Sequence, residues 1–442
     1  MHIAIIGAGW AGLAAAVELC HRGHNITVVE SARQAGGRAR GVDSGDIRID
    51  NGQHLLIGAY HQTRGLLERI GLRDDEVFER RRLRLMMYLL QENWAIDIHV
   101  ARLPAPLHML AALITARGLT LTERWLAIRF CAALPTLRHD KINDLTVASL
   151  LQRYRQSERL VTALWEPLCL AIMNTPTKLA SASVFVRVLR DAFLHDRHDS
   201  DLLIPIRDLG AVIPEPAIDF IRRHGGQVHL GRRITSLNIS GNRVTAALDK
   251  DGSSIEADQF IIATTPLACQ RLVASHDLFA SLNEQLTCFD YAPICTVYLQ
   301  YPAAVSSDPP MSGLLGGHGQ WLFDRRLCGQ PGLMAVVISG HGEHEHMDNA
   351  DLARDISNEL ATLHPDWPAP LRSHVLREKR ATFVCDPASD RFRPGHATAA
   401  HNTWLAGDYT ATGYPATLEG AILSGRRCAA TLLRKADSGL GV

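Results

Sequence analysis

The sequence predicts an α/β fold in two domains, one built on a parallel sheet and the other of α+β type. Three observations predict this fold. The chain begins with a short apolar strand, a glycine-rich turn and a helix, and a strand, a glycine turn and a helix recur near its C-terminus. At 442 residues the chain is also too long for one compact core.

The first of these observations lies in the opening twenty residues. Residues 3–6 form an apolar run without helical period, which is typical of a buried parallel strand. Gly7, Gly9 and Gly12 follow in the pattern G-x-G-x-x-G, and residues 13–19 favour a helix. The first glycine permits a tight turn, the second lets the backbone approach a pyrophosphate, and the third lets the helix pack on the strand. This order of strand, glycine turn and helix predicts a Rossmann-type dinucleotide-binding domain.

A second strand is expected at residues 26–29, and Glu30 ends it. A carboxylate at this point accepts hydrogen bonds from a ribose diol, and it favours a free 2′-hydroxyl over a 2′-phosphate. The pyrophosphate is expected at the N-terminus of the first helix, where Trp10 and Ala11 lie between the glycines.

The segment after the second strand indicates which dinucleotide binds. Gly36 and Gly37 expose backbone N–H groups, and Arg38 supplies a cationic fork for a diphosphate. This segment resembles the G-G-R signature of FAD-dependent amine oxidases and phytoene-type desaturases. The resemblance implies FAD as the cofactor.

Residues 47–49 alternate as in a strand, a turn follows, and a helix is expected from about 60 to 70. The run from Asp50 to Tyr60 resembles the squalene-associated flavoproteins, the bacterial hydroxysqualene dehydroxylases of hopanoid synthesis. In that superfamily this loop lies beside the flavin ring, so the resemblance implies Gly52, Gln53 and His54 as flavin neighbours. Two roles stay open for His54: a chemical one, or that of a hydrogen-bonded structural imidazole.

The second domain is expected to start near residue 81, with strands at 85–90 and 94–98 and helices at 107–116 and 121–134. These helices are apolar with interspersed arginines. They are either a lipid-facing entrance or amphipathic helices packed on their own domain, and the second interpretation is favoured.

A helical stripe of apolar side chains is predicted after residue 160, made of Val161, Leu164, Trp165, Leu168 and Ile172. The whole phrase through residue 176 again resembles the squalene-associated flavoproteins, where it lines the substrate cavity. The resemblance implies Trp165, Leu168 and Asn174 as parts of a substrate wall.

The middle of the chain returns to the first domain. Strands are expected at 225–230 and 233–237, and 244–248 with 254–258 form a predicted hairpin. By resemblance, the backbone of Ile234 meets the adenine. The His- and Glu-rich tract at 341–348 is interpreted as a solvated loop, and no metal site is expected.

The block at residues 404–421 reads as a strand, a Gly-Asp turn and a helix that opens near Pro415. It resembles the C-terminal FAD signature of the same superfamily. The resemblance implies that Gly407 and Asp408 bind the ribitol or a phosphate-linked hydroxyl. It also implies that N–H groups near Ala416 and Thr417 face the flavin pyrimidine and that Tyr414 contacts the substrate.

Composition excludes several other classes of protein. The formal net charge is zero, so no electrostatic footprint for nucleic acid is present. Nine scattered cysteines without a C-x-x-C motif are typical of reduced thiols in the cytoplasm. The N-terminus runs straight into a strand, leaving no room for a signal peptide, and no apolar run approaches the ~20 residues of a membrane span. A cytoplasmic protein is expected, with any membrane contact peripheral, on the inner face of the cytoplasmic membrane.

The resemblance covers nearly the whole chain and implies a discontinuous architecture. Residues 1–80, 200–266 and 397–442 are expected to form the FAD-binding domain, and 81–199 with 267–396 the substrate-binding domain. The implied activity is reductive dehydroxylation of hydroxysqualene to squalene, with hydride from the reduced flavin N5, His54 as the proton donor and an electron donor that is unknown.

Three alternatives stay open for the function. One is an FAD-dependent desaturase of squalene, phytoene or a related isoprenoid. The others are an amine oxidase, for which the few lysines give no clear match although Lys178 stays open, and a non-enzymatic escort of prenylated proteins.

Overall fold

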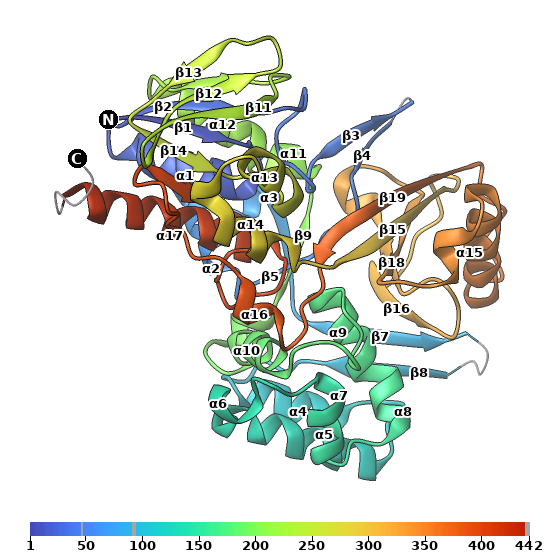
Figure 1. The fold of residues 1–442 in the computed structure, drawn as a ribbon. Coiled ribbons are helices and arrows are strands. Elements are labelled where there is room, and N and C mark those ends of the chain that lie inside the picture. The colour runs from blue at the N-terminus through green and yellow to red at the C-terminus, as the bar shows by residue number, and fades with distance from the viewer. Residues whose placement is uncertain (46, 91–93, 438–442) are drawn as a thin grey trace.

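The computed structural model describes residues 1–45, 47–90 and 94–437. Its fold is α/β, and a five-stranded parallel sheet lies at one end of the molecule (Figure 1). In spatial order the strands are β10 (Gln227–His229), β2 (Asn25–Val29), β1 (His2–Ile6), β14 (Gln259–Ile262) and β20 (Thr403–Leu405).

The two faces of this sheet belong to different cores, because side chains alternate along a strand. Ile3 and Ile5 pack with the helices α1 (Trp10–His21), α12 (Pro214–Arg223) and α17 (Leu418–Asp437). Ala4 and Ile6 share a core with a second, antiparallel sheet of three strands, β11 (Ile234–Ser240), β12 (Arg243–Asp249) and β13 (Ser254–Glu256).

A seven-stranded sheet forms the centre of the second half of the molecule. Its neighbouring strands are antiparallel except β16 and β7, which are parallel. In spatial order they are β19 (Arg372–Phe383), β15 (Tyr291–Gln300), β18 (Leu333–Ser339), β17 (Trp321–Asp324), β16 (Met311–Leu315), β7 (Arg84–Leu89) and β8 (Trp94–His99). One face is covered by α15 (Asn349–Leu363), and the other turns toward the nucleotide-binding half.

A group of helices lies at the end of the molecule remote from the parallel sheet (Figure 1). They are α4 (Leu107–Thr115), α5 (Leu121–Ala133), α6 (His139–Ile142), α7 (Val147–Arg153), α8 (Glu158–Leu160), α9 (Glu166–Met173) and α10 (Ala182–Phe193). No helix of the described residues is long and apolar enough to cross a membrane.

Short elements connect these parts. The hairpin β3 (Gly41–Ser44) with β4 (Ile47–Asp50) and the small sheet β5 (Leu56–Ile57), β9 (Leu202–Pro205) and β6 (Phe78–Arg81) lie between the two halves. The remaining helices are α2 (His61–Ile70), α3 (Asp74–Val77), α11 (Leu209–Val212), α13 (Pro266–Val273), α14 (Ala280–Thr287) and α16 (Ser389–Phe392).

Most predicted elements are confirmed. The helix predicted at 60–70 is α2, and Gly71 ends it in the left-handed region at φ +89°. The predicted hairpin is β12 with β13, in which Ala246 pairs with Glu256. The strands of the two large sheets come from the segments predicted for the two domains, whose exact boundaries remain a prediction.

The predicted helical stripe after residue 160 is not regular. Residues Val161–Trp165 form a π-helical turn ahead of α9. Pro167 has no N–H to donate to the carbonyl of Ala163, so the i to i−4 pattern fails at this point. The extra residue in the turn rotates the side chains before it away from the face of α9.

Candidate active site

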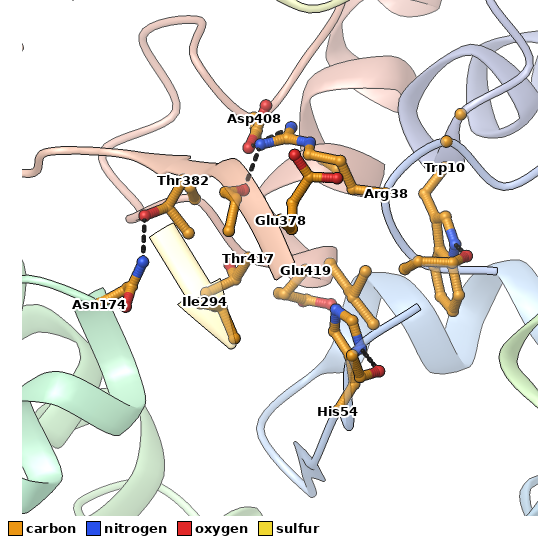
Figure 2. Close-up of a pocket in the computed structure, with 18 of the residues that line it drawn as sticks. Trp10, Arg38, His54, Asn174, Ile294, Glu378, Thr382, Asp408, Thr417 and Glu419 are labelled. Carbon is orange, nitrogen blue, oxygen red and sulfur yellow. Dashed lines mark hydrogen bonds and ion pairs between the residues drawn. The ribbon is translucent and has the colours of Figure 1, made fainter. Parts of the chain in front are cut away.

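A cavity of about 840 Å³ lies where the parallel sheet, the seven-stranded sheet and helices α9 and α10 meet. Residues from both ends of the chain line it, including Gly7 near the start and Thr417 near the end. Figure 2 shows side chains from these distant segments facing one another across it. The cavity therefore joins the predicted cofactor site to the predicted substrate site.

The glycine turn after β1 forms one end of the cavity. Gly7 has φ +113°, and a Cβ there would lie 2.5 Å from the carbonyl oxygen of Ala263. A Cβ on Gly12 would lie 2.0 Å from the Gly7 oxygen, so Gly12 packs α1 against the turn without lining the cavity itself. A Cβ on Gly9 would meet nothing within 4 Å, because Gly9 borders the open space. The three glycines thus divide into two that permit packing and one that keeps the cavity free.

Glu30 lies beside this turn with its carboxylate held by the backbone. Its Oε2 accepts the N–H of Ala8 at 2.8 Å, and Oε1 accepts the N–H of Ala32 at 2.8 Å. Oε1 also accepts the hydroxyl of Ser31 at 3.1 Å, whereas Oε2 retains a second lone pair that a sugar hydroxyl can use. Ala11 and Ile234 line the same region of the cavity.

Trp10 fixes the second glycine loop. Its ring lines the cavity, and its Nε1–H donates to the carbonyl of Ala39 at 2.9 Å. Gly36 and Gly37, both with positive φ, also line the cavity and precede Arg38 in the chain. The Trp10 side chain thus links the first glycine turn to this second glycine loop.

Arg38 and Asp408, predicted as separate cofactor contacts, bind each other. Arg38 Nη2 lies 2.7 Å from Asp408 Oδ2, and Arg38 Nη1 donates to the carbonyl of Ala381 at 2.6 Å. Burial opposes the charge, but Asp408 outweighs it and raises the pKa of Arg38. Glu378, which the sequence did not single out, lines the cavity beside this pair (Figure 2). The ion pair joins the two predicted FAD signatures across 370 positions of the chain.

The loop of residues 50–54 is held by a buried ion pair that the sequence did not reveal. Arg325 Nη1 lies 2.8 Å from Asp50 Oδ2, and both side chains are 1% exposed. The same Nη1 donates to Oε1 of Gln53, which lines the cavity. Asp50 Oδ1 in turn accepts the N–H of Leu209 at 2.7 Å. No local pattern links Arg325 to this loop, because Asp50 and Gln53 lie more than 270 residues earlier.

His54 lines the cavity, and its Nδ1 lies 2.9 Å from the carbonyl oxygen of Gly52. A carbonyl only accepts, so Nδ1 carries the hydrogen and the neutral ring has its lone pair at Nε2. Burial lowers the pKa of His54, although the Gly52 carbonyl and Asp50 oppose this shift. The neutral imidazole is a hydrogen-bond acceptor at Nε2, and it becomes a proton donor there only after protonation.

The C-terminal block closes the cavity from the other side. Gly407, Ala416 and Thr417 line it, and Thr417 Oγ1 accepts the N–H of Gly420 at 3.1 Å as the N-cap of α17. The first N–H groups of a helix have no acceptor within the helix, so this end is suited to a partly negative ligand group. Glu419 is buried, and its carboxylate accepts N–H groups at the start of α2.

Tyr414 lines the cavity and contacts two polar side chains, Arg187 and Asp191, that the sequence analysis did not identify. Its hydroxyl donates to Asp191 Oδ2, and the guanidinium of Arg187 lies 4.4 Å from the centre of its ring. Burial, with Asp191 as a further cause, raises the pKa of Tyr414 to about 12. Arg187 and Asp191 share a face of α10 at a spacing of four residues, which is the signal that could have found them.

The three residues predicted to form a substrate wall occupy different environments. Leu168 lines the cavity. Asn174 also lines it, but its amide is used by the protein: it donates to Thr382 Oγ1 at 2.9 Å and accepts from the N–H of Gly340 at 2.7 Å (Figure 2). Asn174 therefore joins α9 to the large sheet.

Trp165 requires a correction, because it is absent from the described residues that line the cavity. The π-helical turn directs its ring into the helical layer, where it packs edge-on against Phe130 at 5.0 Å between ring centres. Its Nε1–H donates to Gln156 Oε1 at 2.9 Å. The side chain is part of the core and not of a substrate wall.

An apolar region of the cavity comes largely from strands of the seven-stranded sheet to which the sequence gave no site role, with Leu85, Met311, Trp321, Phe323 and Val337. Leu83, just before β7, and Ile172 of α9 complete it. No lysine is found among the described residues of the lining, and Lys178 is exposed elsewhere on the surface.

Comparison with known proteins agrees with this geometry. The sequence model of the family described as flavin containing amine oxidoreductase matches residues 10–433. A hydroxysqualene dehydroxylase of Rhodopseudomonas palustris is 30% identical over an alignment of 444 residues that covers 97% of each chain. A probable zeta-carotene desaturase of Synechococcus elongatus is 24% identical over 482 aligned residues, with 98% of each chain covered. An oxidoreductase of Methanosarcina mazei has the same fold, with a TM-score of 0.73 over 98% of this chain and 100% of its own at 13% identity.

Proposed function

Because this chain belongs to the family of flavin-containing amine oxidoreductases, we propose that it is a hydroxysqualene dehydroxylase that reduces hydroxysqualene to squalene. It is an FAD-dependent oxidoreductase. The observation that carries the proposal is that one cavity joins a dinucleotide site to a deep apolar region. The chain that forms this cavity is 30% identical to a protein of that name.

The residues of the cavity fit FAD. Gly9 leaves open space where any side chain would intrude, and Glu30 offers a carboxylate lone pair to a ribose. At the other end the N-terminus of α17 presents backbone N–H groups near Thr417, and Arg38 lies between the two ends. These groups would hold the adenosine, diphosphate and flavin portions of the cofactor.

Reduced FAD, when bound, supplies the hydride that replaces the substrate hydroxyl, which leaves as water after it receives a proton. The protein must exclude bulk water from this exchange, and the apolar side chains of the lining provide that exclusion. It must also provide the proton at the hydroxyl oxygen.

Two cavity residues are proposed as the proton donor. His54 donates from Nε2 when protonated, and its depressed pKa makes that form scarce at neutral pH. Tyr414 holds its proton at all physiological pH values and shares it with Asp191. The two candidates predict different dependences of rate on pH.

The alternative is a desaturase that oxidises an isoprenoid, which the similarity to the zeta-carotene desaturase supports at lower identity. The amine oxidase hypothesis gains no support from the cavity, whose described lining contains no lysine. The cavity and its intact glycine turns also give no support to a carrier without redox activity.

The test is an anaerobic single turnover of photoreduced protein with hydroxysqualene, followed by flavin absorbance and lipid extraction. We expect the flavin to reoxidise and squalene to form in equal amount. If the reduced protein does not react while squalene or phytoene bleaches the oxidised protein, the enzyme is a desaturase and the proposal fails.

We also propose that the protein acts in the cytoplasm, at the inner face of the membrane from which a long-chain isoprenoid would come. The apolar character of that substrate supports this location. Fractionation of cells, with the protein detected in the soluble and membrane fractions after a high-salt wash, tests it.

A further inference from the structure

Exposed apolar side chains are concentrated on one part of the surface. Among the described residues, ten large hydrophobic side chains are exposed, and six of them lie between residues 103 and 125. They are Leu103, Leu107, Leu110, Ile114, Leu121 and Trp125. Such a concentration on a folded protein marks an interaction site.

Helix α4 shows most clearly that this surface is unusual. Its inward side buries His108, Met109, Ala112 and Leu113. Its outward side carries the exposed Leu107, Leu110 and Ile114, at spacings of three and four residues. A surface helix normally has a polar outer face, whereas this helix is apolar on both sides.

Helix α5 extends the same surface. Leu121 is 80% exposed and Trp125, one turn later, is 63% exposed. Arg124 joins the helices, because its Nη1 donates to the carbonyl of Ile114 at 2.8 Å and its Nε to that of Leu119 at 3.1 Å. Figure 1 shows α4 and α5 side by side at the outer end of the molecule.

The charge around these helices is positive in a chain whose formal net charge is zero. Residues 100–138 contain five arginines and one acidic residue, Glu123. Glu123 is buried and paired with Arg159 at 2.8 Å. Its negative charge therefore does not offset the positive charges of the exposed Arg102 and Arg117. An apolar helix face flanked by arginines is suited to a lipid surface with anionic headgroups.

We propose that the outer face of α4 and α5 docks on an anionic phospholipid bilayer, with Leu107, Ile114, Leu121 and Trp125 inserted among the acyl chains. Arg102 and Arg117 contact the phosphates at the same level. Trp125 is of a residue type that is enriched where proteins meet the membrane interface.

The segment that carries this surface begins close in the chain to a second, smaller cavity that adjoins the main one. A second, smaller cavity shares Leu202 and Met311 with the main one, and its lining includes His99. His99 ends β8, four residues before Leu103 in the chain. The choice of a bilayer over a protein partner rests in part on the proposed function, because an isoprenoid substrate is dissolved in the membrane.

The test compares two double variants of the full-length, FAD-loaded protein. Leu121→Gln/Trp125→Gln alters the proposed surface, and Leu179→Gln/Leu371→Gln alters two equally exposed leucines elsewhere. Binding is measured by flotation with vesicles of phosphatidylglycerol and phosphatidylcholine. We expect the first variant to bind at least about tenfold more weakly and the second to bind as the unaltered protein does.

Two further measurements identify the mode of contact. Arg102→Gln/Arg117→Gln should weaken binding to the anionic vesicles and leave binding to phosphatidylcholine alone unchanged. Brominated lipids should quench the protein fluorescence, and Trp125→Phe should bind but lose most of that quenching.

Specific outcomes overturn the inference. If the unaltered protein does not float with either kind of vesicle, or if both double variants lose binding equally, the surface is not a membrane contact. If sedimentation shows a dimer that Leu121→Gln/Trp125→Gln dissociates, and vesicles are not bound, a second copy covers this face.

The failure of this inference is distinguishable from failure of the proposed function. Single turnover with hydroxysqualene in detergent micelles needs no bilayer, so Leu121→Gln/Trp125→Gln should retain it. Normal turnover in detergent without vesicle binding would leave the function standing and remove the docking surface.

Discussion

The buried pair of Arg325 and Asp50 decides how firmly the loop around His54 is held. Both side chains are almost completely enclosed, and Arg325 also reaches Gln53. A charge left alone in such a place has no water to stabilise it. The pair therefore makes the geometry of a cavity loop depend on Arg325, which directly follows strand β17 of the seven-stranded sheet.

We expect Asp50→Asn to lower the free energy of unfolding by about 3–5 kcal/mol, because Arg325 would stay buried without a counter-charge. Urea denaturation followed by circular dichroism measures the loss. Asp75→Asn is the matched control: Asp75 pairs with Arg73 on the open surface, and its replacement should cause no measurable change. Equal stability of Asp50→Asn and the unaltered protein would contradict the prediction.

The proton donor is a second question at this scale, and the pH dependence of single turnover answers it. If His54 donates, the rate rises as pH falls below about 6.5, since burial lowers the pKa of His54 and more of it becomes protonated. His54→Gln would remove this rise and lower the rate by about 10²–10⁴-fold in the acidic range.

If Tyr414 donates, the rate has no such rise, because its phenol stays protonated up to a pKa of about 12. Tyr414→Phe would then lower the rate by about 10²-fold or more at every pH. The two pH–rate profiles therefore distinguish His54 from Tyr414 as the donor. A rate unaffected by either replacement would assign the proton to another group.

At the scale of elements, the glycines in the turn between β1 and α1 have different roles. Gly12 is needed for the packing of the helix, whereas Gly9 leaves room for the cofactor. A Cβ on Gly12 would collide with the backbone of Gly7, whereas a Cβ on Gly9 would enter empty space in the cavity. Gly9 also has φ −74°, a conformation that alanine adopts freely.

We therefore expect Gly12→Ala to lower the melting temperature of the FAD-free protein, because α1 must move away from β1. Gly9→Ala should leave that melting temperature unchanged and weaken FAD binding, because the methyl group occupies the space of the cofactor. Calorimetric melting of FAD-free protein and fluorescence titration with FAD measure the two effects. A low melting temperature for Gly9→Ala would show that the glycine has a folding role after all.

Elements with a local pattern could be predicted from the sequence. The glycine turn, the helix that ends at Gly71 and the hairpin of β12 and β13 depend on neighbouring residues, and their expected positions are confirmed. Trp165 shows where this reasoning fails, because a regular helical period does not foresee the π-helical turn ahead of Pro167.

The candidate site could be predicted only in outline. Motif residues such as Glu30 and Thr417 line the cavity, but many of the other lining residues come from strands that are remote in the sequence. Arg38 was expected to serve the cofactor alone, yet it binds Asp408. Nothing near Arg325 or Glu378 in the sequence indicates that the fold will bring Arg325 to the loop of residues 50–54 and Glu378 to the cavity.

At the scale of the whole molecule, buried and half-buried histidines couple stability to pH. Burial lowers the pKa of several of them, namely His24, His54, His108, His344, His364 and His396. In the unfolded chain these rings gain protons near pH 6.5, while in the folded protein they stay neutral to lower pH. Protonation thus favours the unfolded state.

We expect the melting temperature to fall as pH is lowered from about 7 to 5. His108 is the clearest contributor, because it is 1% exposed and no described residue gives its ring nitrogens a hydrogen bond. His108→Leu should reduce the fall, and His139→Leu, at an exposed position, should not. Melting curves across this pH range measure both, and an identical fall in all three proteins would contradict the assignment.

The order of strands in the parallel sheet has a consequence for biosynthesis. Strand β20 joins the sheet beside β14, and α17 packs on α1, although both belong to the last forty residues of the chain. Until these two segments have been synthesised, a nascent chain has the glycine turn but lacks Asp408 and the N-terminus of α17. The two ends of the cofactor site therefore come together only after the strands and helices between them have been made, and β20 and α17 complete the site by folding back onto β14 and α1.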